Sequence, residues 1–422
     1  MDTHKNKERH YGIVALIMLT FFVISFLTNA IGPIIPDIIN SFHLNLTLVA
    51  VLPFAFFIAY GIMSLPSAVW NEKFKEKKMM LFAFIISFGG ATWLAIEPNY
   101  LTAVFSLFLI GCGMAVLQVV INPLLRVAGG EEHYAFNSVL AQLFFGLASF
   151  LTPLLYAYLV KQIKHTEPAG NSLVRTVSSV TPRAYPWISL YWVFALICLL
   201  MLIVILISRF PLVNLKADEK AGSLAVYKEL LKNKVVVMYF AGIFCYVGTE
   251  QGVANWISQF LHYYHHYDSD TIGAKAVADF WGLMTLGGVV GLILLKFIDS
   301  KKVLVSFTIL AIIFFTLALF GPRVVSLWCF PIVGFFASVM YPVLFSLALN
   351  SVKGNHGPFS GILLTGVTGG ALIPLIIGKL GDIFDLRAGM MFIYITLFFI
   401  LFTGIYAKPI IKNKVIRINK KD

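Results

Sequence analysis

Apolar residues in this chain are gathered into twelve long runs that are separated by short polar segments. The runs cover residues 11–31, 46–70, 79–96, 101–125, 135–160, 187–209, 235–260, 277–297, 303–320, 324–349, 358–378 and 389–408. A helix of about 20 apolar residues is long enough to cross the hydrocarbon core of a bilayer. The pattern therefore predicts twelve transmembrane helices.

Two connections are longer than the others, at residues 161–186 and 211–234. The second is rich in charged residues and divides the spans into six and six. We therefore expect an all-α membrane protein with 12 transmembrane helices in two six-helix bundles, 1–210 and 235–422, joined by a linker at 211–234. This is the plan of the major facilitator fold, in which the binding site lies between the two halves near the middle of the membrane.

The composition agrees with the pattern, because 59% of the residues are hydrophobic and only 12% are charged. Such a chain is too apolar for a soluble globular protein of this length, and its principal surroundings are expected to be a lipid bilayer. The spans leave no room for a separate catalytic or signalling domain, and neither HExxH nor GxSxG occurs. We expect no enzyme, no cofactor and no metal site, and a sensor is disfavoured for want of an output domain.

The net charge of +12 raises the question of nucleic-acid binding. The basic residues lie in the predicted loops, and roughly three quarters of them fall on the side of the two termini, which is the distribution of a membrane protein with both termini in the cytoplasm. We therefore expect no nucleic acid as a partner. The basic N-terminus precedes a long apolar run without a cleavage site, so that run is expected to be the first transmembrane helix and not a signal peptide.

The most unusual stretch lies inside the apolar run from Val235 to Leu261. Glu250 is expected to be the only acidic residue well inside the hydrocarbon region, where a charge costs at least about 2.5 kcal/mol. Gln251, Asn255 and Gln259 recur every four residues and so share one face of a helix, and Trp256 is adjacent. Either these groups line a wet cavity, or they join helices through hydrogen bonds.

Other predicted spans also carry groups that can donate and accept hydrogen bonds, or flat aromatic faces. A small polyhydroxylated solute needs both kinds of group. For any single amide, a hydrogen bond that only packs two helices is the alternative. The candidates outside the Val235–Leu261 run are Asn29, Gln118, Asn122, Gln142, Trp281 and Tyr341.

Several segments resemble the fucose–galactose–glucose proton symporter family of the major facilitator superfamily. They are INPLLRVAGGEEHYAFNSVLAQLFFGLASFLTP (121–153), FCYVGTEQGVANWI (244–257), YPVLFSLALNSV (341–352) and TGVTGGALIPLIIGKLGD (365–382). The resemblance implies a secondary transporter that moves a monosaccharide, a hexose or deoxyhexose, by alternating access. It also implies the bacterial plasma (inner) membrane as the location, and we expect a functional monomer. Gln142 matches a glutamine of the family that resembles a sugar ligand.

The chain departs from that family at two acidic positions that are implicated in proton coupling. The resemblance implies an aspartate in the first span and a glutamate in the fourth, where this chain has Gly32 and Gln118. Glu250 is then the candidate for cation coupling, through H+ or through Na+ as the coupling ion. The alternatives are an uncoupled sugar facilitator and an exporter of amphiphilic compounds on the same fold.

One further cluster follows the seventh predicted span and consists of His262, His265, His266, Asp268 and Asp270. Histidine and carboxylate side chains together can bind a metal, but a solvated loop is the favoured interpretation. The four cysteines lie within apolar runs and show no metal-ligand spacing. They are expected to be small core residues.

Overall fold

The computed structural model describes residues 10–130, 133–164, 172–211 and 224–410, and within them it contains helices and no strands. In the first half the helices are α1 (Tyr11–Thr28), α2 (Ile31–Phe42), α3 (Leu46–Ile96), α4 (Tyr100–Gly129), α5 (Tyr134–Lys164), α6 (Ser172–Val180) and, after the 3₁₀ turn η2 (Pro186–Ile188), α7 (Ser189–Ile207). The short helix α8 (Leu224–Lys232) follows.

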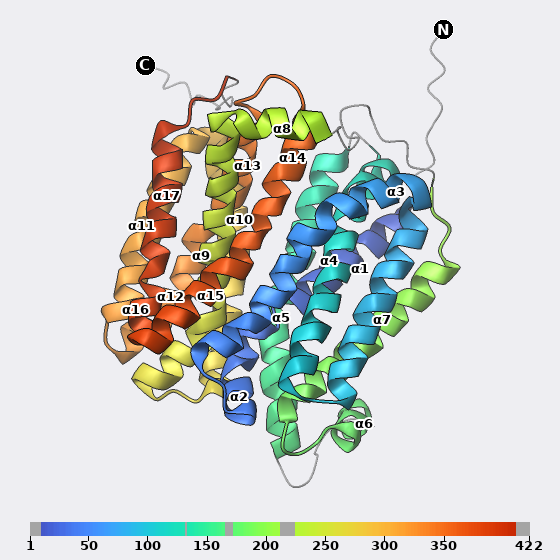
Figure 1. The fold of residues 1–422 in the computed structure, drawn as a ribbon, viewed down its shortest axis with the longest axis vertical. Coiled ribbons are helices and arrows are strands. Elements are labelled where there is room, and N and C mark those ends of the chain that lie inside the picture. The colour runs from blue at the N-terminus through green and yellow to red at the C-terminus, as the bar shows by residue number, and fades with distance from the viewer. Residues whose placement is uncertain (1–9, 131–132, 165–171, 212–223, 411–422) are drawn as a thin grey trace, which may run out of the picture.

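In the second half the helices are α9 (Lys234–His265), the π turn η3 (Ser269–Gly273), α10 (Ala274–Phe297), α11 (Ser300–Phe320), α12 (Arg323–Ala337), α13 (Met340–Leu349), α14 (His356–Thr365), the 3₁₀ turn η4 (Gly366–Thr368), α15 (Gly369–Ile383), α16 (Leu386–Met390) and α17 (Phe392–Tyr406). Figure 1 shows the two halves side by side, with α1 to α7 in blue to green and α9 to α17 in yellow-green to red.

Within the described residues, eleven helical segments are long and apolar enough to cross a membrane. One of them, α3, has 51 residues. At 1.5 Å per residue it would be about 75 Å long if straight, more than twice the hydrocarbon thickness. Its backbone leaves the helical region at Lys75, where φ is 68° and ψ is 162°. This helix therefore supplies two spans, and the prediction of twelve spans in two six-helix bundles is confirmed.

The first span is longer than the sequence pattern predicted. It continues from Tyr11 to Phe42 as α1 and α2, with a short break at residues 29–30. Pro33 has no N–H to donate to the carbonyl of residue 29, and its ring crowds that carbonyl, which explains the break. Asp37 lies within α2, in the last quarter of this long span, whereas Glu250 lies halfway along α9.

Both ends of the described chain lie on one face of the molecule, here called the termini face. The N–H of His10 donates to the carbonyl of Ala128 at 3.2 Å, and the N–H of Ile410 donates to that of Asn350 at 2.8 Å. The opposite face, here called the distal face, carries α2, α6 and the turn η3 (Figure 1). Many large apolar side chains on the outer helix surfaces are exposed, among them Ile207 and Ile96, as expected for a protein surrounded by lipid.

The connections contain short helices that the sequence pattern did not predict. Helix α6 lies in the connection 161–186, and α5 extends to Lys164. The predicted linker 211–234 contains α8, whereas residues 212–223 of this linker lie outside the described part of the chain. Residues 1–9 and the tail from 411 onward, which the predicted bundles 1–210 and 235–422 include, also lie outside it.

The two halves meet mainly along three pairs of helices. Helix α2 packs against α9, α3 against α15, and α5 against α10. The α2–α9 crossing is very close, because a Cβ on Gly32 would lie 2.5 Å from the carbonyl oxygen of Ala254. That crossing places the middle and distal parts of α9 at the seam between the halves.

Candidate functional site

Glu250 lies near the middle of α9 and is partly buried. Its Oε1 accepts a hydrogen bond from Nε2 of Gln251 at 3.1 Å, and its carboxylate also bonds with the Tyr246 side chain, one turn earlier. In the described part of the chain, no ion pair involves this carboxylate. An acidic group held by neutral donors keeps the capacity to bind a proton or a small cation.

Two tyrosines bring a second helix beside Glu250. The rings of Tyr246 on α9 and Tyr341 on α13 have centroids 5.8 Å apart, and Tyr341 stacks on Phe345 at the same centroid distance. Tyr341 is also close enough to Glu250 to interact with its charge. The carboxylate therefore lies next to flat aromatic faces, an arrangement that suits the C–H surface of a solute as well as its hydroxyl groups.

Gln251 and Asn255 are both buried and both lie at the seam. A Cβ on Gly370 of α15 would be 3.1 Å from the Gln251 side chain and 3.1 Å from Phe57 of the first half. The Cα of Asn255 lies opposite Gly32, since a Cβ at residue 32 would be 3.3 Å from it. The polar face that the sequence predicted on this helix therefore reaches the contact surface between the halves.

Some hydrogen-bonding groups on this part of α9 are buried and have no partner among the described residues. They are Nδ2 of Asn255, Nε1 of Trp256 and Oε1 of Gln259. Buried polar groups in proteins are normally paired, and an unpaired one costs about 1–3 kcal/mol. These three groups lie on neighbouring turns of α9 and are free to bond with a polar ligand or water.

Asn29 ends α1, and its amide joins two helices of the first half. Its Nδ2 donates to the hydroxyl of Ser149 on α5 at 2.9 Å and lies 3.3 Å from that of Ser25. Ser25 in turn donates to the carbonyl of Phe145 at 2.6 Å. A packing role thus accounts for the N–H groups of Asn29, while its Oδ1 has no partner in the described structure.

The other candidates of the first half lie on α4 and α5. Gln118 is partly buried, and its backbone carbonyl accepts from Nδ2 of Asn122 at 3.2 Å. Asn122 and Gln142 are exposed. Gln142 lies one turn before Gly146, whose missing side chain makes room for Thr285 of α10. None of the three amides forms a hydrogen bond with Glu250 in the described structure.

Trp281 is buried on α10, one turn before Thr285, which donates to its carbonyl at 2.9 Å. The structure thus brings Glu250, Gln251 and Tyr341 together with Tyr246, which the sequence analysis did not select. A tyrosine one turn before the carboxylate was the available signal, because residues four apart share a helix face. Asn29, Asn122, Gln142 and Trp281 lie elsewhere, at the end of α1 and on α4, α5 and α10.

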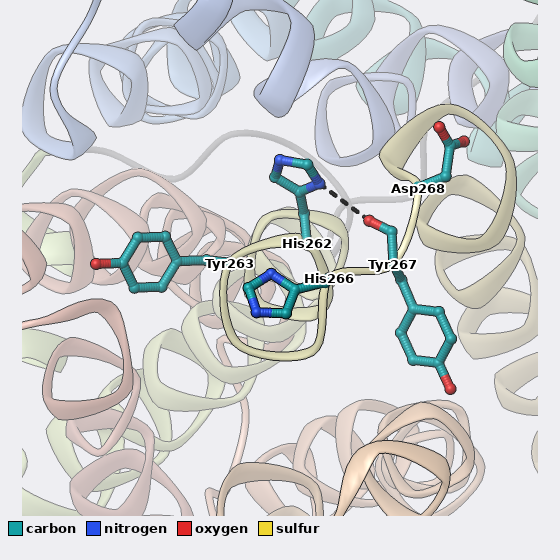
Figure 2. A pocket seen from close by; sticks show the side chains of 5 residues that line it. All are labelled: His262, Tyr263, His266, Tyr267 and Asp268. Atoms are coloured by element: carbon teal, nitrogen blue, oxygen red, sulfur yellow. Dashed lines mark hydrogen bonds between the residues drawn. The ribbon is translucent and has the colours of Figure 1, made fainter.

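The histidine cluster after α9 does not form a metal site in the described residues. No group of three His, Cys, Asp or Glu side chains there lies close enough to hold an ion. Figure 2 shows that the side chains of His262, His266 and Asp268 point in different directions around the helix end. Nδ1 of His262 lies 2.9 Å from the carbonyl oxygen of Tyr267, so this ring helps to close the turn.

The sequence model of the family called Major Facilitator Superfamily matches residues 17–374 of this chain. The chain therefore belongs to this superfamily. It is a family of membrane transporters, which agrees with the twelve spans. The chain is similar to the glucose/galactose transporter of Brucella abortus biovar 1 (strain 9-941), with 29% identity over 421 residues, or 96% of each chain.

Two solved structures show the same fold. One is the Escherichia coli fucose:proton symporter FucP, whose structure in the outward conformation has a TM-score of 0.67 with 18% identity over 94% of this chain and 98% of that one. The other is a bacterial homolog of the human lysosomal transporter Spinster in an inward-facing, unoccupied conformation. It has a TM-score of 0.76 with 14% identity over 94% and 97% of the two chains.

Proposed function

We propose that this protein is a secondary transporter that moves a monosaccharide, a hexose or deoxyhexose, across the bacterial inner membrane by alternating access. The observation that carries the proposal is the grouping of Glu250, Gln251, Tyr246 and Tyr341 near the middle of the spans, on a helix that packs against the other half. Relatives named as glucose/galactose transporter and L-fucose-proton symporter support a sugar as the solute.

Glu250 is the proposed coupling residue. It lies halfway along a span, and its observed partners are neutral side chains. A carboxylate of this kind can carry a proton or hold a sodium ion. The positions at which the resemblance implies other coupling acids hold Gly32 and Gln118, so no other carboxyl replaces it at those places.

The sugar is proposed to contact the polar face of α9, amides of the first half and aromatic side chains of the second half. The proposed ligands are Gln251, Asn255, Trp256, Gln118, Asn122, Gln142, Asn29, Trp281 and Tyr341. The unpaired donors of Asn255 and Trp256 support a polar ligand next to α9, and the tyrosine rings support one with a C–H face. The protein is proposed to act as a monomer with both termini in the cytoplasm.

Residues 1–210 and 235–422 are proposed to be the two bodies that rock against each other, with 211–234 as their linker. The contact of α2 with α9 closes the distal face in this structure. With the termini on the cytoplasmic side, as the distribution of basic residues supports, this is the inward-facing arrangement.

The test is uptake of labelled glucose, galactose and fucose into proteoliposomes that contain the purified protein. Imposed gradients of protons and of sodium are applied separately, and exchange without a gradient is measured by counterflow. Accumulation of one sugar above its external concentration under one gradient supports coupled transport. Counterflow without accumulation indicates a facilitator, and absence of both with every sugar contradicts the proposal.

A further inference from the structure

Polar side chains on the distal face connect the two halves at two separate places. The first lies where α5 of the first half meets η3 of the second. Lys164 forms an ion pair with Asp270, whose side chain is only 15% exposed, whereas that of Lys164 is 50% exposed. An ion pair with a largely buried carboxylate is less screened by water than one on an open surface.

A tyrosine and a second carboxylate support this ion pair. The hydroxyl of Tyr156 donates to Oδ2 of Asp37 at 2.6 Å and lies 3.4 Å from Oδ1 of Asp270. A phenol has one proton to donate, so the short contact to Asp37 is the strong one. Tyr156 is buried, and its hydroxyl lies between Asp37, which it bonds within the first half, and Asp270 across the seam.

The second place is the start of α3, where a carboxylate of the other half caps the helix. Oδ1 of Asp382 accepts from the N–H of Leu46 at 2.9 Å. Its Oδ2 accepts from the N–H of Thr47 at 2.8 Å and from the Thr47 hydroxyl at 2.5 Å. The first N–H groups of a helix have no partner within that helix and carry a partial positive charge, so an anion there is stabilised.

Close packing of α15 against the start of α3 allows Asp382 to make these bonds. Gly378 lies one turn earlier on the same face of α15, and a Cβ there would be 2.5 Å from the carbonyl oxygen of Leu46. The absence of a side chain at residue 378 lets α15 approach the start of α3 closely enough for the Asp382 carboxylate to reach it. The bonds therefore depend on close contact of the two halves.

We propose that these two links, Lys164–Asp270 with Tyr156 and Asp382 with Leu46 and Thr47, form a two-point latch that holds the distal face closed. Each link joins one half to the other through a different pair of elements, so together they oppose both separation and rotation about a single contact. Opening of the distal face breaks the Lys164–Asp270 ion pair, the Tyr156–Asp270 contact and the bonds of Asp382, whereas the Tyr156–Asp37 bond lies within the first half. The inference rests on the proposed alternating access, which it deepens by naming the groups that hold one of the two states.

The experiment measures distances between pairs of spin labels in liposomes, with the native cysteines replaced by alanine. Labels at Glu97→Cys and Val324→Cys report the distal face, and labels at Lys73→Cys and Lys353→Cys report the termini face; all four residues are exposed. The latch variants are Asp382→Asn and Asp270→Asn, singly and together. The control is Asp279→Asn, whose bond to Lys275 at 2.5 Å lies within α10 alone.

The latch predicts that each variant increases the population with a longer distal distance and a shorter distance at the termini face. The double variant should increase this open population at least tenfold, while the population in Asp279→Asn should equal that in the unmodified protein. The exchanged pair Lys164→Asp with Asp270→Lys should restore much of the closed state. Latch variants with the same distance distributions as the control would overturn the proposal.

Two further measurements separate a folding defect from loss of the latch, and failure of the latch from failure of the proposed function. If Asp270→Asn fails to fold, as judged by gel filtration and thermal unfolding, Lys164→Met removes the same ion pair from a half-exposed position. Sugar counterflow by the unmodified protein tests the proposed function separately. If the protein shows sugar counterflow but the spin-label distances do not change in the latch variants, only the latch is contradicted. If the distances change but no sugar is transported, only the proposed solute is contradicted.

Discussion

Gly32 of α2 lies directly against the carbonyl oxygen of Ala254 on α9, so closely that a Cβ at residue 32 would be 2.5 Å from it. Real Cβ atoms do not approach a backbone oxygen to this distance, and the oxygen belongs to a helix that cannot easily move. This is also the position at which the family resemblance implies an aspartate. In this protein the position serves helix packing across the seam, and a carboxylate there is incompatible with the closed distal face.

Gly32→Ala is therefore expected to weaken the closed state. Inserting a methyl group into such a contact costs about 1–3 kcal/mol, which corresponds to a shift of roughly fivefold to 150-fold in the conformational equilibrium. Spin-label distances on the distal face should lengthen. Gly89→Ala is the matched control, because a Cβ at residue 89 meets no atom within 4 Å. Equal behaviour of the two variants would show that the α2–α9 contact does not hold this state.

Glu250→Gln is expected to abolish accumulation of sugar against its gradient while leaving counterflow measurable. Glutamine retains the shape and the ability to accept from Gln251 and Tyr246, but it cannot bind and release a proton or balance the charge of a cation. Uptake under an imposed gradient and counterflow are measured on the same preparation. Glu97→Gln, in the exposed connection between α3 and α4, is the control. Full accumulation by Glu250→Gln would remove this residue from coupling.

Trp256→Phe is expected to weaken sugar binding by about tenfold, which is the loss of one hydrogen bond of about 1.4 kcal/mol. The buried indole N–H of Trp256 has no partner in the described structure, so its removal leaves no protein group unpaired. The affinity is measured from the concentration dependence of counterflow. Trp192→Phe is the control, because its indole N–H is also unpaired but lies on α7. Equal affinities in the two variants would exclude the Trp256 N–H as a ligand.

Ser149→Ala is expected to lower stability without changing the affinity for sugar. The Ser149 hydroxyl accepts from Asn29 at 2.9 Å and lies 2.6 Å from the hydroxyl of Ser25. Its loss leaves the buried Asn29 amide with only the longer contact to Ser25 at 3.3 Å, at a cost of about 1 kcal/mol. Thermal unfolding in detergent measures the first effect, and counterflow measures the second. A change of sugar preference with unchanged stability would instead show that the Ser149 hydroxyl, and not only Oδ1 of Asn29, takes part in sugar binding.

The pattern of apolar runs allowed the spans to be predicted because a helix in lipid must satisfy its own backbone hydrogen bonds and present apolar side chains outward. Both requirements are local, so they can be read along the chain without knowledge of the packing. The same reasoning selected Glu250 and its amide neighbours, since a polar face on one helix follows from a spacing of four residues. It failed at residues 31–42, where Gly32, Pro33 and Pro36 suggested an end to the span and so hid Asp37 within α2.

The sequence by itself thus determined that the chain is a twelve-span membrane protein and that one span has a polar face. Only the tertiary structure decided which helices meet across the seam, because that depends on shapes that fit at close range between residues hundreds of positions apart. Gly32 opposite Ala254, Phe57 opposite Gly370 and Asp382 at the start of α3 are contacts of this kind. None leaves a periodic signal in the chain, since each arises from a single pair of surfaces in contact.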